Sequence, residues 1–211
     1  LSRFPRFPKN GLIVDFCAGN GAVGLFASSR TKAKILSVEI QERLADMAER
    51  SVQLNGLEEQ MQVICDDLKN MPAHIKGSKV DMILCNQPYF KVDPHSNPNE
   101  SEHYLLARHE IATNLEEICR SAQSILKSNG RLAMVHRPDR LLDILDMLQR
   151  HNLAPKRLQF VYPKREKEAN MLLIEAIKDG STSGFKVLPP LIVHNDDGSY
   201  TPEIQEIYYG S

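Results

Sequence analysis

The chain has 211 residues, of which 42% are hydrophobic and 25% are charged, and its formal net charge is −1 at pH 7. This length and composition suit one sizeable core, and the near-neutral charge excludes a strongly basic protein while leaving a local basic face open. No apolar run approaches the roughly 18 residues of a membrane span, and we expect no signal peptide. The 4 cysteines show no CxxC spacing and are expected to be free thiols of a cytoplasmic protein without a metal.

Strands and helices are expected to alternate from the first residues onward. Short apolar runs predict strands, and longer runs with apolar residues every three or four positions predict helices. The first ten residues lack an initiating Met, and we expect a missing upstream segment. The elements expected up to residue 85 are strands at 11–17, 34–39, 61–65 and 80–85, and helices at 22–30 and 41–54.

The second half continues this pattern after a polar loop at residues 91–103. The expected elements are helices at 104–127 and 138–151 and strands at 131–136, 158–162 and 170–177. The joint at 163–169 is too short for a crossover helix, so the last two strands should be antiparallel. The expected fold is α/β, a Rossmann-like doubly wound seven-stranded sheet, mostly parallel with an antiparallel C-terminal strand pair. It forms one domain over residues 1–178, with a tail at 179–211 that packs on the sheet edge and turns at 196–198.

A glycine-containing turn follows the first strand. Gly19 and Gly21 let the backbone approach a ligand closely. Glu39 ends the next strand and can accept hydrogen bonds from two ribose hydroxyls. The turn also matches GxGxxG, so a nicotinamide dinucleotide is an alternative. Asp15, inside the first strand, disfavours it because a carboxylate repels a pyrophosphate but attracts an amino-acid ammonium.

Two further signals stand at the ends of the third and fourth strands. Asp67 can accept from an adenine amino group, and the run Asn86-Gln87-Pro88-Tyr89 combines amide oxygens with a flat ring. The carboxyl ends of parallel strands line the ligand crevice of an open α/β sheet. The four strand ends together favour S-adenosyl-L-methionine as the cofactor.

With these motifs the chain resembles the class I S-adenosylmethionine-dependent methyltransferases, whose Asn-Pro-Pro-Tyr motif is similar to the run at 86–89. It resembles more narrowly the bacterial valine-tRNA adenine N6-methyltransferase family. The segments that carry this narrower resemblance are residues 39–41, 107–110, 135–138 and 170–177. The resemblance covers nearly all of residues 11–178.

The resemblance implies methyl transfer to the N6 amino group of an adenine in tRNA, in valine tRNA next to the anticodon. The methionine part of the cofactor would lie at the glycine turn, its ribose at Glu39 and its adenine between Ile40 and Asp67. Asn86 and the backbone carbonyl of Gln87 would accept from the target amine, and Tyr89 would stack on the flipped base. The catalytic set is Asn86, Gln87, Pro88 and Tyr89, and the cofactor-binding set is Asp15, Gly19, Asn20, Gly21, Glu39, Ile40, Asp67, Leu68 and Asn86.

Gln87 departs from the family, which has proline at this position. The backbone carbonyl is kept, and the lost stiffness amounts to about 0.4–1 kcal/mol of unfolded-state entropy. We therefore expect reduced or normal activity rather than loss.

The expected partner is tRNA, bound by a monomer or weak dimer with no membrane. Candidate RNA contacts are Arg108, Arg137, Arg140, Lys164 and Arg165, although each alone is equally consistent with solvated surface charge. Three alternatives stay open: a glutamine N5 protein methyltransferase, an rRNA guanine N2-methyltransferase, and a catalytically impaired cofactor-binding module.

Overall fold

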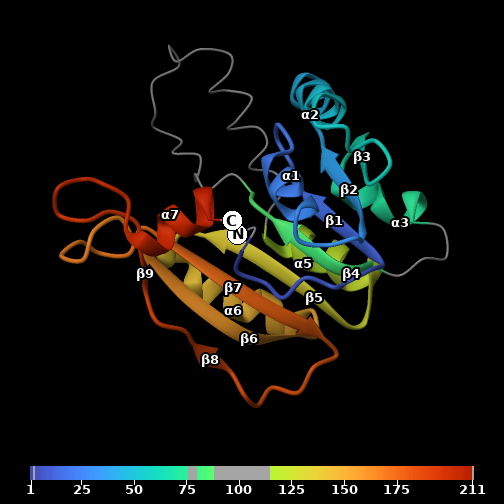
Figure 1. Ribbon diagram of the computed structural model, residues 1–211. Helices are drawn as coiled ribbons and strands as arrows, with labels where there is room; N and C mark the ends of the chain where they lie inside the picture. The colour runs from blue at the N-terminus through green and yellow to red at the C-terminus, as the bar shows by residue number, and fades with distance from the viewer. Residues whose placement is uncertain (2, 76–79, 88–114, 211) are drawn as a thin grey trace, which may run out of the picture.

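A computed structural model describes residues 1, 3–75, 80–87 and 115–210 of the chain (Figure 1). The described strands are β1 (Leu12–Phe16), β2 (Lys34–Glu39), β3 (Met61–Cys65), β4 (Val80–Cys85), β5 (Leu126–His136), β6 (Leu153–Tyr162), β7 (Met171–Lys178), β8 (Lys186–Val187) and β9 (Leu191–Ile192). The described helices are α1 (Ala22–Ser28), α2 (Glu42–Leu54), η1 (Leu68–Asn70), α3 (Met71–His74), α5 (Leu115–Ile125), η3 (Pro138–Arg140), α6 (Leu141–Arg150) and α7 (Pro202–Tyr209).

All described strands join one sheet with the order β3-β2-β1-β4-β5-β7-β6-β8, and β9 also pairs with β6. Strands β3, β2, β1, β4 and β5 are parallel, whereas β7 is antiparallel to both β5 and β6. Since β6 is antiparallel to β7, it points the same way as β5. The carboxyl ends of these six like-oriented strands therefore share one edge of the sheet, where open α/β folds bind ligands.

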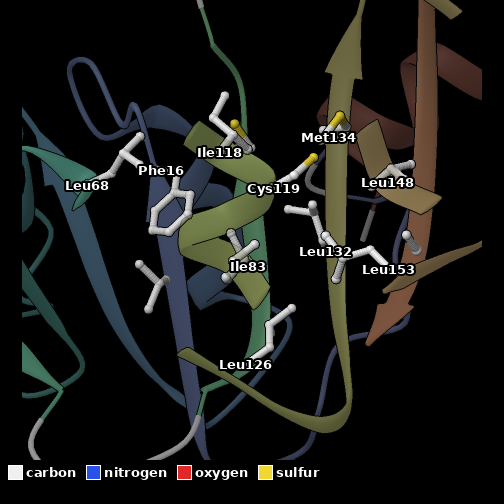
Figure 2. Close-up of a cluster of buried hydrophobic side chains, with 14 of the residues drawn as sticks. Phe16, Leu68, Ile83, Ile118, Cys119, Leu126, Leu132, Met134, Leu148 and Leu153 are labelled. Carbon is white, nitrogen blue, oxygen red and sulfur yellow. The ribbon is translucent and has the colours of Figure 1, made fainter. Parts of the chain in front are cut away.

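Helices cover both faces of the sheet, which explains why the central strands are continuous apolar runs. Side chains of β1 alternate between the two faces. Ile13 packs in a cluster with Val52 of α2, and Phe16 packs in a second cluster with Ile118 of α5 and Leu148 of α6 (Figure 2). The predicted doubly wound architecture, mostly parallel with an antiparallel pair, is confirmed.

The predicted count of seven strands is wrong, because nine strands join the sheet in the described part of the chain. The two additional strands, β8 and β9, lie in the tail and pair in parallel with β6, the outermost long strand. Each has only two residues, too few to show any periodicity in the sequence. The tail also forms α7, where the side chain of Thr201 caps the helix and Pro202 occupies its first turn.

The junction between α5 and β5 also differs from the prediction. The expected helix at 104–127 ends earlier, because Leu126 and Lys127 already belong to β5; residues 104–114 lie outside the described residues. The Asn-Gly pair at residues 129–130 is typical of a helix end. It instead forms a bulge, with Val80 opposite Leu126, where a Cβ on Gly130 would lie 2.8 Å from the carbonyl oxygen of Lys127. Glycine therefore allows the close backbone approach within an irregular strand.

Two further predictions concern a polar loop and the absence of a membrane span. The expected polar loop at 91–103 lies outside the described residues. Within the described part of the chain, no helix is long and apolar enough to cross a membrane.

Candidate active site

A cavity of about 350 Å³ opens at the carboxyl ends of β1, β2, β3 and β4. Its volume falls within the range of about 300–1,000 Å³ typical of small-molecule sites. The lining residues are Cys17, Ala18, Gly19, Asn20, Ala22, Val23, Val38, Glu39, Ile40, Gln41, Leu44, Asp66, Asp67, Leu68, Asn86 and Gln87. The fold therefore brings together predicted residues from four separate strand ends.

The turn after β1 forms the floor of this cavity. Gly19 and Gly21 have φ angles of 57° and 83°, in the left-handed region that glycine adopts without strain. A Cβ on Gly19 would meet no atom within 4 Å, so the backbone here faces open space. Cys17 also has a positive φ of 56°, which the sequence analysis did not anticipate. Gly19 thus faces the cavity, whereas Gly21 does not line it, since a Cβ on Gly21 would lie 3.1 Å from that of Ala48 in α2. Binding of a ligand by this turn stays a prediction.

Glu39 joins the end of β2 to the turn after β1. Its Oε2 accepts a hydrogen bond of 2.7 Å from the backbone N–H of Gly19, and its Oε1 accepts one of 3.0 Å from that of Gln41. The side chain is buried at 5% exposure, so it is held in one orientation. Each carboxylate oxygen has two lone pairs, so each oxygen of Glu39 can accept one further hydrogen bond from a hydroxyl.

Asp15 lies beneath the turn and does not line the cavity. It is fully buried, and its Oδ2 accepts a hydrogen bond of 3.0 Å from the backbone N–H of Gly24 in α1. Burial raises the pKa of Asp15, the Gly24 hydrogen bond lowers it and the nearby Glu39 raises it, which together bring the pKa to about 7. These contacts tie β1 to α1, and a direct role of Asp15 at the cofactor ammonium stays a prediction.

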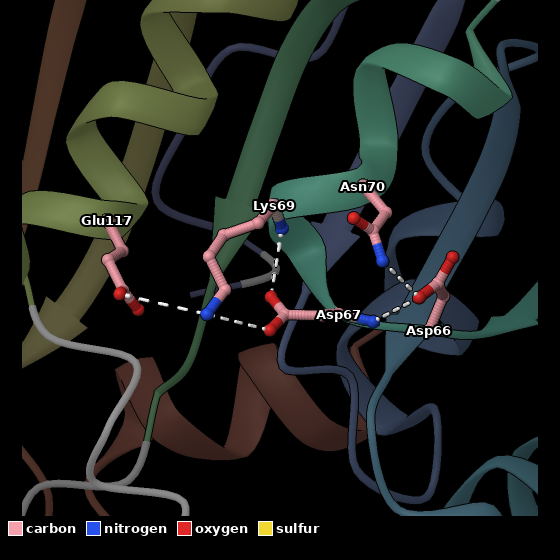
Figure 3. Close-up of polar contacts among 5 residues, drawn as sticks. All are labelled: Asp66, Asp67, Lys69, Asn70 and Glu117. Atoms are coloured by element: carbon pink, nitrogen blue, oxygen red, sulfur yellow. Dashed lines mark hydrogen bonds and ion pairs between the residues drawn. The ribbon is translucent and has the colours of Figure 1, made fainter.

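Two consecutive carboxylates follow β3 (Figure 3). Oδ1 of Asp67 accepts from the backbone N–H of Lys69 at 2.9 Å, and its Oδ2 lies 3.0 Å from Nζ of Lys69. The same Nζ lies 3.8 Å from Oε1 of Glu117 in α5. The hydrogen bond to Asp67, followed by the two negative charges, raises the pKa of Lys69. Asp67 is therefore fixed at the cavity wall by one residue, Lys69.

Asp66 also lines the cavity but was not predicted as a site residue. Its Oδ1 accepts hydrogen bonds of 2.7 Å from the Asp67 N–H and from Nδ2 of Asn70, and its Oδ2 lies 2.7 Å from Nε2 of His74. The His74 hydrogen bond, followed by those of Asn70 and Asp67, lowers the pKa of Asp66. The sequence places Asp66 next to Asp67, but periodicity alone could not show that both residues line the cavity.

Apolar side chains complete the wall near these carboxylates. Ile40 lines the cavity and is 52% exposed, which is high for an isoleucine and suits contact with a planar ring. Leu68 lines the cavity from a buried position. Other lining residues that the sequence analysis missed are Cys17, Ala18, Ala22, Val23, Val38, Gln41 and Leu44.

The motif after β4 reaches the cavity with its first two residues. Asn86 is exposed, whereas Gln87 is only 6% exposed. The side-chain oxygen of Gln87 has no hydrogen-bond partner among the described residues. Pro88 and Tyr89 lie outside the described residues, so their predicted roles stay predictions.

The described candidate RNA contacts, Arg137, Arg140, Lys164 and Arg165, do not line the cavity, and Arg108 lies outside the described residues. Arg137 follows β5, and Lys164 and Arg165 follow β6, so all three stand at the carboxyl edge of the sheet. Nε of Arg140 lies 2.7 Å from Oδ2 of Asp143, and Lys164 donates to the backbone oxygen of Asp196. Arg137 lies 3.5 Å from a carboxylate oxygen of Asp139. Three of the candidate side chains, Arg137, Arg140 and Lys164, thus already contact a carboxylate or backbone oxygen.

Solved structures with a similar fold are methyltransferases. A predicted O-methyltransferase from Agrobacterium tumefaciens aligns with a TM-score of 0.76 over 99% of this chain and 93% of that chain, at 22% identity. The geranyl diphosphate C-methyltransferase of Streptomyces coelicolor A3(2), solved with Mg²⁺, geranyl diphosphate and S-adenosyl-L-homocysteine, aligns with a TM-score of 0.60 over 80% of this chain and 71% of that chain, at 13% identity. The fold is therefore that of the S-adenosylmethionine-dependent methyltransferases.

The family assignment is narrower than the fold. The family model of the methyltransferase small domain matches residues 1–152, and the chain belongs to that family. A relative from Porphyromonas gingivalis, named tRNA1(Val) (adenine(37)-N6)-methyltransferase, is 27% identical over 194 residues, which is 90% of this chain and 75% of that protein. The expected family and the expected cofactor, S-adenosyl-L-methionine, are confirmed at this level.

The residues present fit this cofactor. The cavity offers an open glycine backbone, a buried carboxylate at Glu39, an exposed aliphatic face at Ile40 and a carboxylate at Asp67. These groups match an amino-acid chain, a ribose, an adenine face and an adenine amino group in chemical type. The assignment of each group to its residue stays a prediction.

Proposed function

We propose that this chain transfers a methyl group from S-adenosyl-L-methionine to the N6 amino group of an adenine in tRNA, namely adenine 37 of a valine tRNA. The observation that carries the proposal is that Asn86 and Gln87 line the cavity at the end of β4, in a chain whose relatives carry this activity in their names. A localisation in the cytoplasm is part of the same proposal, because the substrate is tRNA.

The amine of adenine is a poor nucleophile because its lone pair is delocalised into the ring. The side-chain oxygen of Asn86 and the backbone carbonyl of Gln87 accept hydrogen bonds from the two N–H groups. This favours rehybridisation and directs the lone pair into the cavity. S-adenosylmethionine supplies an electrophilic methyl group there when bound. The nitrogen becomes acidic after transfer, so the proposal requires neither a strong general base nor a metal.

The target base must leave its stack to reach the cavity. In the proposal, Tyr89 stacks on the flipped base and offsets part of that cost, since stacking of a base on an aromatic ring is worth roughly 1–3 kcal/mol. Arg137, Lys164 and Arg165 contact RNA phosphates around the cavity. Their position at the carboxyl edge of the sheet supports this role.

The test is transfer of labelled methyl from S-adenosylmethionine to unmodified tRNA, followed by nucleoside analysis. The proposal predicts label in N6-methyladenosine with a valine tRNA and none with the same tRNA carrying guanine at position 37. Label in N2-methylguanosine of rRNA or in glutamine of a protein would instead establish one of the alternative substrates. Cofactor binding with no transfer to any substrate would identify an impaired module.

A further inference from the structure

Gln87 carries a buried polar atom that the described structure does not satisfy. Its side chain is 6% exposed and lines the cavity, yet its Oε1 has no hydrogen-bond partner among the described residues. Buried amide oxygens are almost always hydrogen-bonded, because an unpaired one has lost its water without compensation. Among the described residues that line the cavity, no other has a buried side-chain oxygen or nitrogen left without a partner. This pattern indicates that a ligand completes the site.

The sheet order indicates which part of the cofactor lies near Gln87. Strand β4 lies beside β1 and on the opposite side from β2 and β3. Glu39 ends β2 and Asp67 follows β3, and both are expected at the ribose and adenine. The end of the cavity between the glycine turn and Gln87 is thus left for the amino-acid part of the cofactor.

That end of the cavity needs an acceptor for a cationic ammonium group. The sequence suggested Asp15, whose Oδ2 accepts from the Gly24 N–H and whose Oδ1 has no partner among the described residues, but this side chain is fully buried and does not line the cavity. The oxygens of Glu39 each accept from a backbone N–H group, of Gly19 or Gln41, and their remaining lone pairs are the ones predicted to accept from the ribose. The oxygen of Gln87 has no such commitment within the described residues.

We propose that the side-chain oxygen of Gln87 accepts a hydrogen bond from the α-ammonium group of the bound cofactor. The last torsion of a glutamine side chain is broad, so its oxygen can turn toward the cavity at little cost. A hydrogen bond from a cation is shorter and stronger than one between neutral groups. Proline, the residue of the related motif at this position, has no side-chain oxygen. In this proposal Gln87 binds the cofactor through its side chain, which the proline of the related motif could not do.

The test measures binding of two ligands to the whole chain by calorimetry. The first is S-adenosylhomocysteine, which carries the α-ammonium, and the second is its des-amino analogue, which keeps the carboxylate, sulfur and adenosine. The proposal predicts that Gln87→Leu weakens S-adenosylhomocysteine roughly ten-fold to a hundred-fold and leaves the analogue unchanged. Unchanged analogue binding also shows that the variant is folded.

A matched control is Gln62→Leu, the same substitution at an exposed site on β3, which should change neither affinity. Equal weakening of both ligands by Gln87→Leu, or no change in either, would overturn the proposal. The wild-type chain gives a test independent of any variant, because equal affinity for the two ligands would also overturn it. The proposal rests on the cofactor and not on the RNA substrate, so it can hold even where transfer to tRNA is not found.

Discussion

The backbone N–H of Gly19 donates a hydrogen bond of 2.7 Å to Oε2 of Glu39. This bond connects the turn after β1 to the end of β2, which are the two strand ends that the cofactor must bridge. The same carboxylate also accepts from the N–H of Gln41, at the start of α2. Glu39 therefore shapes the glycine turn, and the role predicted for its remaining lone pairs is to accept from a ribose.

Glu39→Gln should weaken S-adenosylhomocysteine binding by about ten-fold or more. A glutamine presents one amide N–H₂ group, which cannot accept from a backbone N–H, so either Gly19 or Gln41 loses its acceptor. The measurement is calorimetric titration. Glu49→Gln, at an exposed position of α2, is the matched control and should bind as the wild type does. Equal affinity of the two variants would show that Glu39 does not hold the site.

Asp67→Asn should reduce the preference for adenine over hypoxanthine. Adenine has an exocyclic amine that donates to a carboxylate, whereas hypoxanthine has a carbonyl that repels one. The measurement compares S-adenosylhomocysteine with S-inosylhomocysteine. We expect the wild-type chain to prefer the adenine ligand roughly ten-fold or more and the variant to lose most of this preference. A preference ratio that is unchanged in the variant would contradict the role of Asp67.

The pKa of Asp15, raised to about 7 mainly by burial, makes stability depend on pH. Between pH 4 and pH 7 the folded chain keeps this proton while the unfolded chain loses it. The free energy of unfolding should therefore fall as pH rises, by up to about 1.4 kcal/mol per pH unit, and level off above pH 7.

Asp15→Asn should remove that part of the pH dependence, since asparagine does not titrate and its oxygen can still accept from Gly24. The measurement is denaturant unfolding of both chains at several pH values from 4 to 8. Asp46→Asn, at an exposed site on α2, should leave the slope unchanged. If the free energy of unfolding changed with pH equally in Asp15→Asn and in the wild type, the Asp15 carboxyl would be ionised in the folded chain and the prediction would be wrong.

The basic side chains at the carboxyl edge of the sheet predict how tRNA affinity depends on salt concentration. Replacing both Lys164 and Arg165 by glutamine should weaken tRNA binding and reduce the slope of log affinity against log salt by about one to two, since each phosphate contact contributes about 0.9. Arg50→Gln, at an exposed position of α2, is the control and should keep the slope. An unchanged slope in the double variant would mean that the RNA follows another path.

Local patterns were enough to predict the parallel core and the glycine turn, because buried strands and left-handed glycines have direct signals in sequence. The complete burial of the Asp15 side chain could not be predicted in this way, since it depends on how α1 packs against β1. Asp66 was missed because the sequence alone does not show which of two adjacent carboxylates lines a cavity, and in the folded chain both do. The early start of β5 was missed because residues 129–130 have the composition of a helix end, although Gly130 serves a bulge.

The helix α7 was missed although its cap at Thr201 and Pro202 is visible in the sequence. The helix is short and has one buried residue, Ile204, so its apolar periodicity is weak. The residues at the end of β4 were predicted as a motif, but the buried oxygen of Gln87 could be seen only in the folded chain.

The most direct test of the proposed chemistry is single-turnover methylation of a valine tRNA by the wild-type chain and by Asn86→Ala. The account predicts N6-methyladenosine at position 37 with the wild type and a rate about a hundred-fold lower with the variant, both measured at saturating S-adenosylmethionine. Equal rates for the two chains, or label in any other nucleoside, would contradict it.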